Sequence, residues 1–257
     1  MTESSEHRQL PVVELKVGGS PSATARIPIA IEGSQLQLSI TVPTEPVKLS
    51  CILPILQGIA NEVVAVAESN VAQADERVSC KEGCGACCRQ IVPISPSEAH
   101  AIQQFVELLP EQRRETIRQR FRLAVQRLRE ANLLELLQDP TLEIDEAQVA
   151  SDYFQLGIAC PFLEDESCSI HQNRPLVCRE YLVTSPPEEC SRPGANNVRC
   201  VPIPASTSWV LRAMDWDAMP LQTGWLPLVL SLQWAASNPE PEPQPGPHWI
   251  QHFFTRL

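Results

Sequence analysis

The chain of 257 residues is long enough for one large domain or two small ones, and either can bury a hydrophobic core without disulfides. Hydrophobic residues make up 43% of the sequence and charged residues 20%, a composition typical of globular proteins and unlike that of disordered chains. The formal net charge of -11 excludes a generally basic nucleic-acid binder, because such proteins need a cationic face to neutralise phosphates.

The N-terminus and the hydropathy pattern predict neither a targeting signal nor a membrane segment. Residues 1–8 are polar and lack the apolar core of a secretory signal. The best candidate for a membrane helix, residues 225–236, is shorter than the ~18 residues required and contains Pro227 and Gln233. We therefore expect a soluble cytoplasmic protein without a membrane partner, whose ten cysteines serve metal binding rather than disulfides.

The N-terminal part of the chain has the alternating pattern of β-strands. Apolar and polar residues alternate over residues 13–17, 25–31 and 36–42, which predicts three short antiparallel strands. Residues 32–34 are typical of a hairpin turn between the last two strands. Pro28 cannot donate a ladder hydrogen bond, so we expect it at an edge or a bulge.

From residue 52 onward the apolar period becomes helical. A first helix is predicted from residue 52 to about 74, with an apolar stripe of Ile55, Ile59, Val63, Val66 and Ala67. Ser95 and Glu98 form a predicted capping box with Pro96 at the first helical position, so a second helix runs to about residue 109. A longer helix follows from Pro110, with an apolar face of Ile117, Phe121, Ala124, Leu128, Ala131 and Leu134, and stops by residues 139–140.

The polar face of this third helix is rich in arginine. The simplest interpretation is a solvated face whose arginines pair with Glu111, Glu115 and Glu130. A second interpretation is a docking site for an acidic partner protein. Overall acidity and few aromatic residues argue against RNA or any other nucleic acid. The arginines concerned are Arg113, Arg114, Arg118, Arg120, Arg122, Arg127 and Arg129.

The C-terminal third is less regular. Residues 160–204 are rich in Cys, Pro, Asn and Ser, and we expect metal ligation to order them. Two apolar helical pieces are predicted over residues 209–234, interrupted around Pro220 and Pro227. Residues 239–247 are typical of a stiff polyproline spacer. The amphipathic tail, residues 248–257, is a second candidate surface for a protein partner.

These elements predict an α+β fold that is mostly α-helical. Its helices are expected to pack around an irregular, cysteine-rich metal-binding core. We divide the chain into an N-terminal β-rich segment (1–50), a cysteine-cluster domain (51–204) with a helical insert at about 95–156, a C-terminal helical extension (205–238), and the proline-rich spacer with its tail (239–257).

Cysteines are concentrated in two parts of the chain. Four occur within nine residues, spaced Cys-x3-Cys-x2-Cys-Cys, and four more follow at wider spacing. Between Cys84 and Cys87 a Gly-Ala pair lets the backbone turn tightly and direct N–H groups at sulfur. Soft thiolates select zinc or iron–sulfur clusters over magnesium or calcium. We therefore predict a metal site held by Cys80, Cys84, Cys87, Cys88, Cys160, Cys168, Cys178 and Cys190.

Three details of this pattern leave alternatives open. Adjacent side chains in an extended segment point to opposite faces, so Cys87 and Cys88 are expected to differ: one of them could bind a second metal, bridge two metals or face the core. Arg174 and Arg179 flank Cys178 and either offset thiolate charge or form ordinary surface ion pairs. Cys51 and Cys200 lie outside the pattern.

The combination of motifs resembles a known family. Cys80-x3-Cys84-Gly-Ala-Cys87-Cys88-Arg, followed by Cys-Pro-Phe-Leu, Cys-Ser-Ile-His and Arg-Pro-x-x-Cys-Arg, is similar to the CxxCxxCC proteins, also called YkgJ-like cysteine-cluster proteins. The likeness covers residues 80 to 190, and one extra residue separates Cys80 from Cys84. It implies binding of an iron–sulfur cluster or of zinc. Flagellin lysine methylases carry a similar cluster, so the resemblance also leaves protein modification open.

Three functions follow as expectations. We favour a protein that holds an iron–sulfur cluster, slightly ahead of zinc, in a redox or accessory role. The alternatives are a zinc-stapled protein-interaction module and a cluster-dependent protein-modifying enzyme. A radical-SAM enzyme fits poorly, because Ala86 replaces the usual aromatic residue and the repeated β/α pattern is missing. A catalytic pair of Cys178 with His171 lacks a third supporting group.

Overall fold

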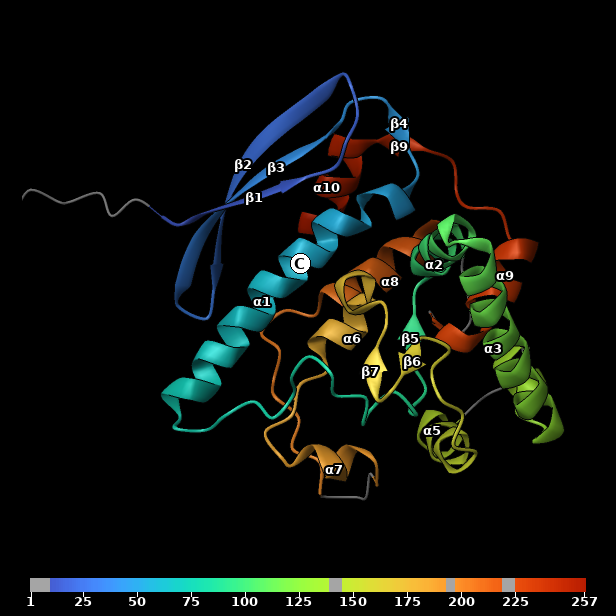
Figure 1. Cartoon of the computed structure of the whole chain (residues 1–257). Helices are drawn as coiled ribbons and strands as arrows, with labels where there is room; N and C mark the ends of the chain where they lie inside the picture. Colours follow the sequence, from blue (N-terminus) through green and yellow to red (C-terminus); the bar gives the residue numbers. More distant parts are fainter. Residues whose placement is uncertain (1–9, 139–144, 193–196, 219–224) are drawn as a thin grey trace, which may run out of the picture.

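The computed structural model describes residues 10–138, 145–192, 197–218 and 225–257, and confirms a mostly helical α+β fold (Figure 1). The predicted breaks at residues 139–140 and at Pro220 lie outside the described residues. The larger helices are α1 (Leu53–Gln73), α2 (Pro96–Leu108), α3 (Glu111–Glu130), α5 (Glu146–Gln155), α8 (Thr207–Ala218) and α10 (Gly246–Phe254). The shorter ones are α4 (Leu134–Gln138), α6 (Leu176–Glu180), α7 (Pro187–Cys190), α9 (Ser231–Ser237) and the 3-10 turns η1 (Leu49–Ile52), η2 (His171–Asn173) and η3 (Leu228–Leu230).

Three strands form the N-terminal sheet: β1 (Val12–Lys16), β2 (Ser22–Ile31) and β3 (Ser34–Pro43), in the order β1-β3-β2. The predicted hairpin between β2 and β3 is confirmed, with Glu32 and Gly33 at φ of 43° and 85°. Pro28 lies in the edge strand β2, as its missing N–H requires. The described residues also form three two-residue ladders, namely β4 (Pro46–Val47) with β9 (Gln244–Pro245), β5 (Pro93–Ile94) with β8 (Leu226–Pro227), and β6 (Leu163–Glu164) with β7 (Ser167–Cys168).

The prediction of a fully antiparallel sheet is wrong for β1, which pairs in parallel with β3. After β1 the chain passes to the far edge to form β2, and β3 then returns into the middle. β3 is the most apolar of the three strands, and Leu38 and Ile40 are buried, so the central place suits it. The central strand β3 is therefore antiparallel to β2 on one side and parallel to β1 on the other.

Helix α1 lies beneath the sheet and forms the largest core with it (Figure 1). The predicted apolar stripe is buried at every position. By length and composition alone, the segment Leu49–Gln73 could also cross a membrane, and it is the one such helix among the described residues. In the structure more than half of its apolar window is buried inside the protein, which is the pattern of a core helix.

The capping box of α2 is confirmed, because the Ser95 side chain accepts from the Glu98 N–H and Glu98 accepts from the Ser95 N–H. The next prediction needs a correction, because α3 ends at Glu130 and α4 is a separate helix. Asn132 adopts a left-handed conformation with φ of 58°, and the Leu133 N–H bonds the Leu128 carbonyl at 3.0 Å. This is a Schellman cap, in which asparagine replaces the usual glycine.

The two apolar pieces predicted over residues 209–234 correspond to α8 and to η3 with α9.

The proline-rich segment, residues 239–247, packs against the N-terminal half of the chain. The Lys48 ammonium donates to the carbonyls of Glu240 and Pro241, and the Ser50 N–H donates to the Glu240 carboxylate at 3.0 Å. β9 then pairs with β4, and α10 buries Trp249, Ile250 and Phe253 in the core that contains the sheet and α1. The apolar face of the predicted tail is therefore covered by the protein itself. A role of this tail in binding a partner stays a prediction, as do the boundaries expected at residues 50, 204 and 238.

Candidate metal centre

The two cysteine-rich parts of the chain lie side by side and are joined through their backbones. The Cys160 N–H donates to the Cys88 carbonyl at 2.7 Å, and the Ser79 N–H donates to the Val183 carbonyl at 2.8 Å. Val183 also pairs with Cys200 in an isolated bridge. The segment 79–91 is thereby held against residues 158–204, from which the second set of cysteines comes.

Consecutive tight turns shape the first cysteine segment. The Cys84 N–H bonds the Lys81 carbonyl, and the Cys88 N–H bonds the Gly85 carbonyl at 3.0 Å. Gly85 is buried against the β6–β7 hairpin, and a Cβ atom there would lie 2.6 Å from both the Glu166 carbonyl oxygen and Leu163 Cδ1. The glycine between Cys84 and Cys87 is therefore required for close approach to the hairpin that carries Cys168.

Substituting Gly85 tests this contact. Gly85→Ala is expected to lower the free energy of unfolding by about 1–3 kcal/mol, because the methyl group overpacks a backbone contact. Gly18→Ala is the matched control, since a Cβ at Gly18 meets no heavy atom within 4 Å. Urea denaturation of both variants gives the comparison. Equal stability of the two variants would contradict the assigned role of Gly85.

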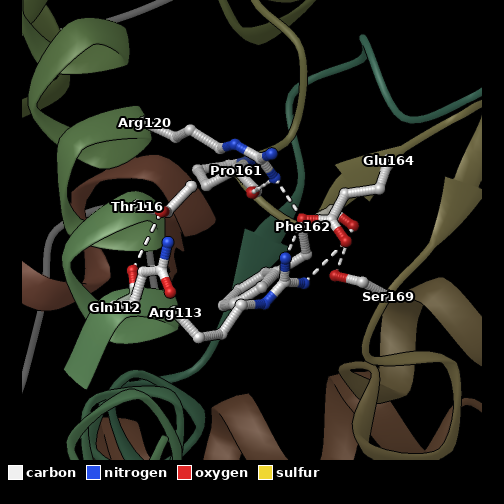
Figure 2. A network of polar contacts seen from close by, with 8 residues as sticks. All are labelled: Gln112, Arg113, Thr116, Arg120, Pro161, Phe162, Glu164 and Ser169. Atoms are coloured by element: carbon white, nitrogen blue, oxygen red, sulfur yellow. Dashed lines mark hydrogen bonds and ion pairs between the residues drawn. The ribbon is translucent and has the colours of Figure 1, made fainter. Parts of the chain in front are cut away.

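The β6–β7 hairpin is anchored on α3 at one end and on the first cysteine segment at the other. The Glu164 carboxylate accepts from Arg113 and from Arg120, and Arg120 also donates to the Pro161 carbonyl at 3.2 Å (Figure 2). At the hairpin tip, Arg89 forms a bidentate ion pair with Glu166. Arg113 and Arg120 thus bind the hairpin, in place of the predicted pairing within α3.

Elsewhere on α3, the expectation of pairs with glutamates of the same helix is confirmed, among the described residues, for Arg122 alone, which pairs with Glu115. Arg118 pairs with Glu107 of α2, and Arg127 donates to the Leu156 carbonyl after α5. The arginine-rich face therefore connects α3 to its neighbours.

One group of thiols comes from three places in the sequence: Cys80, Cys84 and Cys190, called here the first thiol group. Cys190 is buried, and its pKa rises to about 11, chiefly by burial and then through the nearby thiolates of Cys87, Cys80 and Cys84. Burial also raises the pKa of Cys80, with Cys87 and Cys84 adding to the increase. These three thiols are therefore near enough to affect one another's ionisation.

The second thiol group consists of Cys160, Cys168 and Cys178. Burial raises the pKa of Cys160 to about 12, and the thiolates of Cys168 and Cys87 raise it further. Burial also raises the pKa of Cys178 well above its ordinary value, with contributions from Cys160 and Cys87. Cys178 lies on α6, Cys168 at the end of the hairpin, and Cys160 in the turn before it.

Cys87 stands between the two thiol groups and interacts with both. Its pKa is raised first by a hydrogen bond with the Cys88 thiol and then by burial. The sequence left open whether these adjacent cysteines serve different sites. Cys87 interacts with both groups and is hydrogen-bonded to Cys88, which is consistent with one cysteine of the pair serving each group.

Several thiols already accept hydrogen bonds from the backbone. The sulfur of Cys160 accepts from the Phe162 N–H and that of Cys168 from the Ile170 N–H, in each case two residues along the chain. The sulfur of Cys80 accepts from the Val183 N–H. Each bond favours the thiolate form, which is the form that binds metal, and such bonds to sulfur are known to tune iron–sulfur potentials.

Within the part of the chain that the structure describes, no three Cys, His, Asp or Glu side chains converge closely enough to hold a metal ion as they stand. The eight predicted ligands are soft donors gathered in one region, and their chemistry fits zinc or an iron–sulfur cluster.

Cys51 and Cys200, which had no predicted role, are exposed. The pKa of His171 is lowered, first by burial and then by Arg174.

The comparison with known proteins agrees with this site. Residues 79–200 match the model of the CxxCxxCC family, described as "Putative zinc- or iron-chelating domain". We call this segment the CxxCxxCC domain, after the family model that it matches. No curated protein and no solved structure matches the chain. The likeness to flagellin lysine methylases, the cytoplasmic location and a protein partner are untouched by these comparisons and stay predictions.

Two arginines of the CxxCxxCC domain lie among the thiols. Arg179 is buried and donates to the Arg174 carbonyl, the Gln172 carbonyl and Asn61 Oδ1. Its pKa falls to about 10, chiefly through burial and then repulsion from Arg174, while the Cys178 thiolate opposes the decrease. Arg174 carries a buried Nε atom without a hydrogen-bond partner and stabilises the thiolates of Cys80, Cys87 and Cys168. Ordinary surface pairing therefore does not describe these arginines.

Three buried carboxylates position the helix that carries Cys178. Asp215 of α8 accepts from the Ser97 N–H and hydroxyl in the first turn of α2, at 2.9 and 2.6 Å. Glu98 of α2 accepts from the Leu176 N–H at the start of α6, at 2.7 Å. Glu180 of α6 in turn accepts from the Ser208 N–H in the first turn of α8, at 3.0 Å.

These contacts close a ring in which α2, α6 and α8 each place a carboxylate at the N-terminus of another helix. Free N–H groups and the helix dipole both favour negative charge there. The three side chains belong to residues that are 0–8% exposed, so each depends on its donors for solvation. The sequence analysis identified Glu98 only as a capping residue and missed Glu180 and Asp215. The sequence signal that could have identified Glu180 and Asp215 is the position of each acidic residue among apolar residues of a helix.

This ring predicts a dependence of stability on pH. Burial raises the pKa of Asp215 from 3.8 to about 6 and that of Glu98 from 4.5 to about 7. The native state therefore holds these protons more tightly than the unfolded chain. Their stabilising contribution is complete below pH of about 4 and is lost as the pH rises to about 7.

Comparison with Asp215→Asn isolates one of these groups. Between pH of about 4 and 6, the stability of the wild type is expected to fall relative to this variant by up to about 3 kcal/mol, because asparagine does not titrate. Urea denaturation across this range measures the difference. Parallel pH profiles of the two proteins would contradict the assignment.

Proposed function

We propose that the CxxCxxCC domain holds an iron–sulfur cluster through its cysteine thiolates and serves in a redox or accessory role. The observation that carries the proposal is the gathering of six thiols from both parts of the chain around a seventh, that of Cys87. Cys88 is hydrogen-bonded to Cys87, which brings the number of candidate ligands to eight. Soft, deprotonated sulfur ligands of this number suit iron–sulfur chemistry.

The surroundings of the thiols favour a cluster that carries net negative charge. Arg179 is buried, and among the described residues its guanidinium donates to two backbone carbonyls and an amide oxygen rather than to a carboxylate. A buried guanidinium is stabilised when several thiolates lie near it. Backbone N–H groups on three of the sulfurs add to this stabilisation. When bound, the cluster would supply an electron-transfer centre, and the protein's part is to bind it and set its potential.

A second candidate, structural zinc, is favoured by one specific observation. The two thiol groups contain three cysteines each, and Cys87, which interacts with both groups, is hydrogen-bonded to Cys88. One additional thiolate for each group would give two four-thiolate sites, the usual number of ligands for structural zinc. Such sites would staple the two cysteine-rich parts of the chain for binding to another protein.

Analysis of protein purified without oxygen distinguishes the two candidates. We expect iron and acid-labile sulfide in matching amounts, together with broad visible absorption that bleaches on reduction. Colourless protein with stoichiometric zinc and no sulfide would overturn the iron–sulfur proposal and support zinc. Reconstitution of metal-free protein with iron and sulfide, or with zinc alone, then shows which group restores the stability of the native chain.

A further inference from the structure

A groove beside the arginine-rich helix is unused by the metal centre. It has a volume of about 680 Å³ and lies between α3 on one side and α2 with α9 on the other, which Figure 1 shows as neighbours. Its apolar lining includes Phe121 and Val125 of α3, Val229 of η3 and Leu232 of α9. A volume of this size is typical of binding sites rather than of packing defects.

Arginines stand along the α3 wall of this groove. Arg118, Arg122 and Arg129 all line it, at spacings of four and seven residues that place them on one face of the helix. At a rise of 1.5 Å per residue, these cations extend over ~16 Å, about three helical turns. Between them lie Val125 of α3 and Leu232 of α9, which are only half-buried, so an apolar floor and a cationic rim run in parallel.

The arginines are available to a partner to different degrees. Arg118 is held by Glu107, which also lines the groove, and Arg122 is held by Glu115. Both pairs are solvent-exposed, and exposed ion pairs contribute little to stability. Arg129, at the C-terminal end of α3, lines the groove without an ion-pair partner among the described residues. A partner's carboxylates can replace Glu107 and Glu115 at little cost.

The spacing of the cations selects the kind of ligand. A small amphipathic anion such as a fatty acid carries one charge at one end and would leave two of the three arginines unused. A nucleic acid would gain little from an apolar floor whose aromatic residue, Phe121, is 3% exposed and so closed to base stacking. An amphipathic helix with carboxylates on successive turns matches both the floor and the rim.

We propose that this groove is a docking site for an acidic amphipathic helix of a partner protein. The partner's apolar face lies on the floor between α3 and α9, and its carboxylates pair with Arg118, Arg122 and Arg129. Binding of this kind gains on-rate and specificity from charge, so its affinity falls as salt is added. The proposal does not depend on which metal the cysteines hold.

Binding of designed peptides to the full-length, metal-loaded protein tests the proposal. The probe is a fluorescent helical peptide of about 14 residues with leucine on one face and glutamate on the other. The control peptide carries lysine at every glutamate position. We expect the acidic peptide to bind at least about tenfold more tightly than the lysine peptide, with an affinity that weakens as salt is added.

Matched charge-reversal variants locate the site. Arg122→Glu combined with Arg129→Glu is expected to weaken binding of the acidic peptide at least about tenfold. Arg26→Glu combined with Arg77→Glu makes the same change of net charge at exposed positions elsewhere and should leave binding unchanged. Glu107→Gln removes the competing carboxylate and should tighten binding by a few-fold. These opposite signs separate a specific groove from general charge attraction.

Several results would overturn the proposal. Equal affinity for both peptides, or no binding of the acidic one, would show that the groove does not select this chemistry. Equal loss of binding in the two double variants would assign the effect to net charge alone. Self-association of the chain that Arg122→Glu with Arg129→Glu abolishes would show that a second copy occupies the groove instead.

Discussion

Cys87→Ser is expected to remove bound metal and to destabilise the CxxCxxCC domain by on the order of 5 kcal/mol or more. Cys87 interacts with the thiols of both groups, so its loss affects ligands from both parts of the chain. Because the free energy of metal binding adds to that of folding, losing the metal lowers stability directly. Metal content by mass spectrometry and urea denaturation together measure the effect.

The exposed cysteine of η1 provides the control. Cys51→Ser changes a thiol outside both groups and should leave metal content and stability unchanged. Cys190→Ser and Cys178→Ser each remove a member of one thiol group. Loss of about half of the metal in each would indicate two sites, whereas complete loss in both would indicate one cluster. Unchanged metal content in Cys87→Ser would contradict the assignment of this residue.

Glu180→Ala is expected to lower the free energy of unfolding by about 3–5 kcal/mol, the largest effect of any change outside the cysteines. The Glu180 carboxylate accepts from the hydroxyls of Thr207, Ser208 and Ser206 and from the Ser208 N–H. Alanine leaves these donors without their acceptor. It also frees the end of α6, the helix that carries Cys178.

Two further variants make this prediction specific. Glu180→Gln keeps the shape of the side chain and one acceptor oxygen, so its loss of stability should be smaller than that of alanine. Glu115→Ala removes an exposed carboxylate whose partner, Arg122, is also exposed, and should change the free energy of unfolding much less than Glu180→Ala does. A loss in Glu180→Ala as small as that in Glu115→Ala would contradict the role of the carboxylate ring.

Local sequence signals predicted the local structure well. The capping box at Ser95 and Glu98, the turn at Glu32 and Gly33, and the apolar stripe of α1 all depend on residues within a few positions of each other. Their physical causes, which are free N–H groups, left-handed backbone and burial of one helix face, are contained in the segments themselves.

Features that depend on distant partners were not predictable in the same way. The parallel pairing of β1 depends on which strand takes the centre of the sheet. The tip of the β6–β7 hairpin places Asp165 and Glu166 at φ of 47° and 58°, although neither residue is a glycine or asparagine that would mark such a turn. The carboxylate ring joins residues up to 118 positions apart.

The cysteine site combines a local feature, which the sequence predicts, with a feature that depends on distant residues. Their spacing was sufficient to predict a thiolate site, because soft ligands at this density have few other uses in a protein of this size. It was not sufficient to divide them into two groups around Cys87 and Cys88. That division results from the contact of residues 79–91 with residues 158–204, which the sequence alone does not fix.

X-ray absorption at the iron and zinc edges of the purified protein tests the central claim most directly, because it identifies the metal and the atoms bound to it. We expect a first shell made of sulfur, with no contribution from nitrogen or oxygen beyond background, and loss of this signal in Cys87→Ser but not in Cys51→Ser. A first shell dominated by nitrogen or oxygen, or an identical spectrum in Cys87→Ser, would contradict a metal centre built from these thiolates.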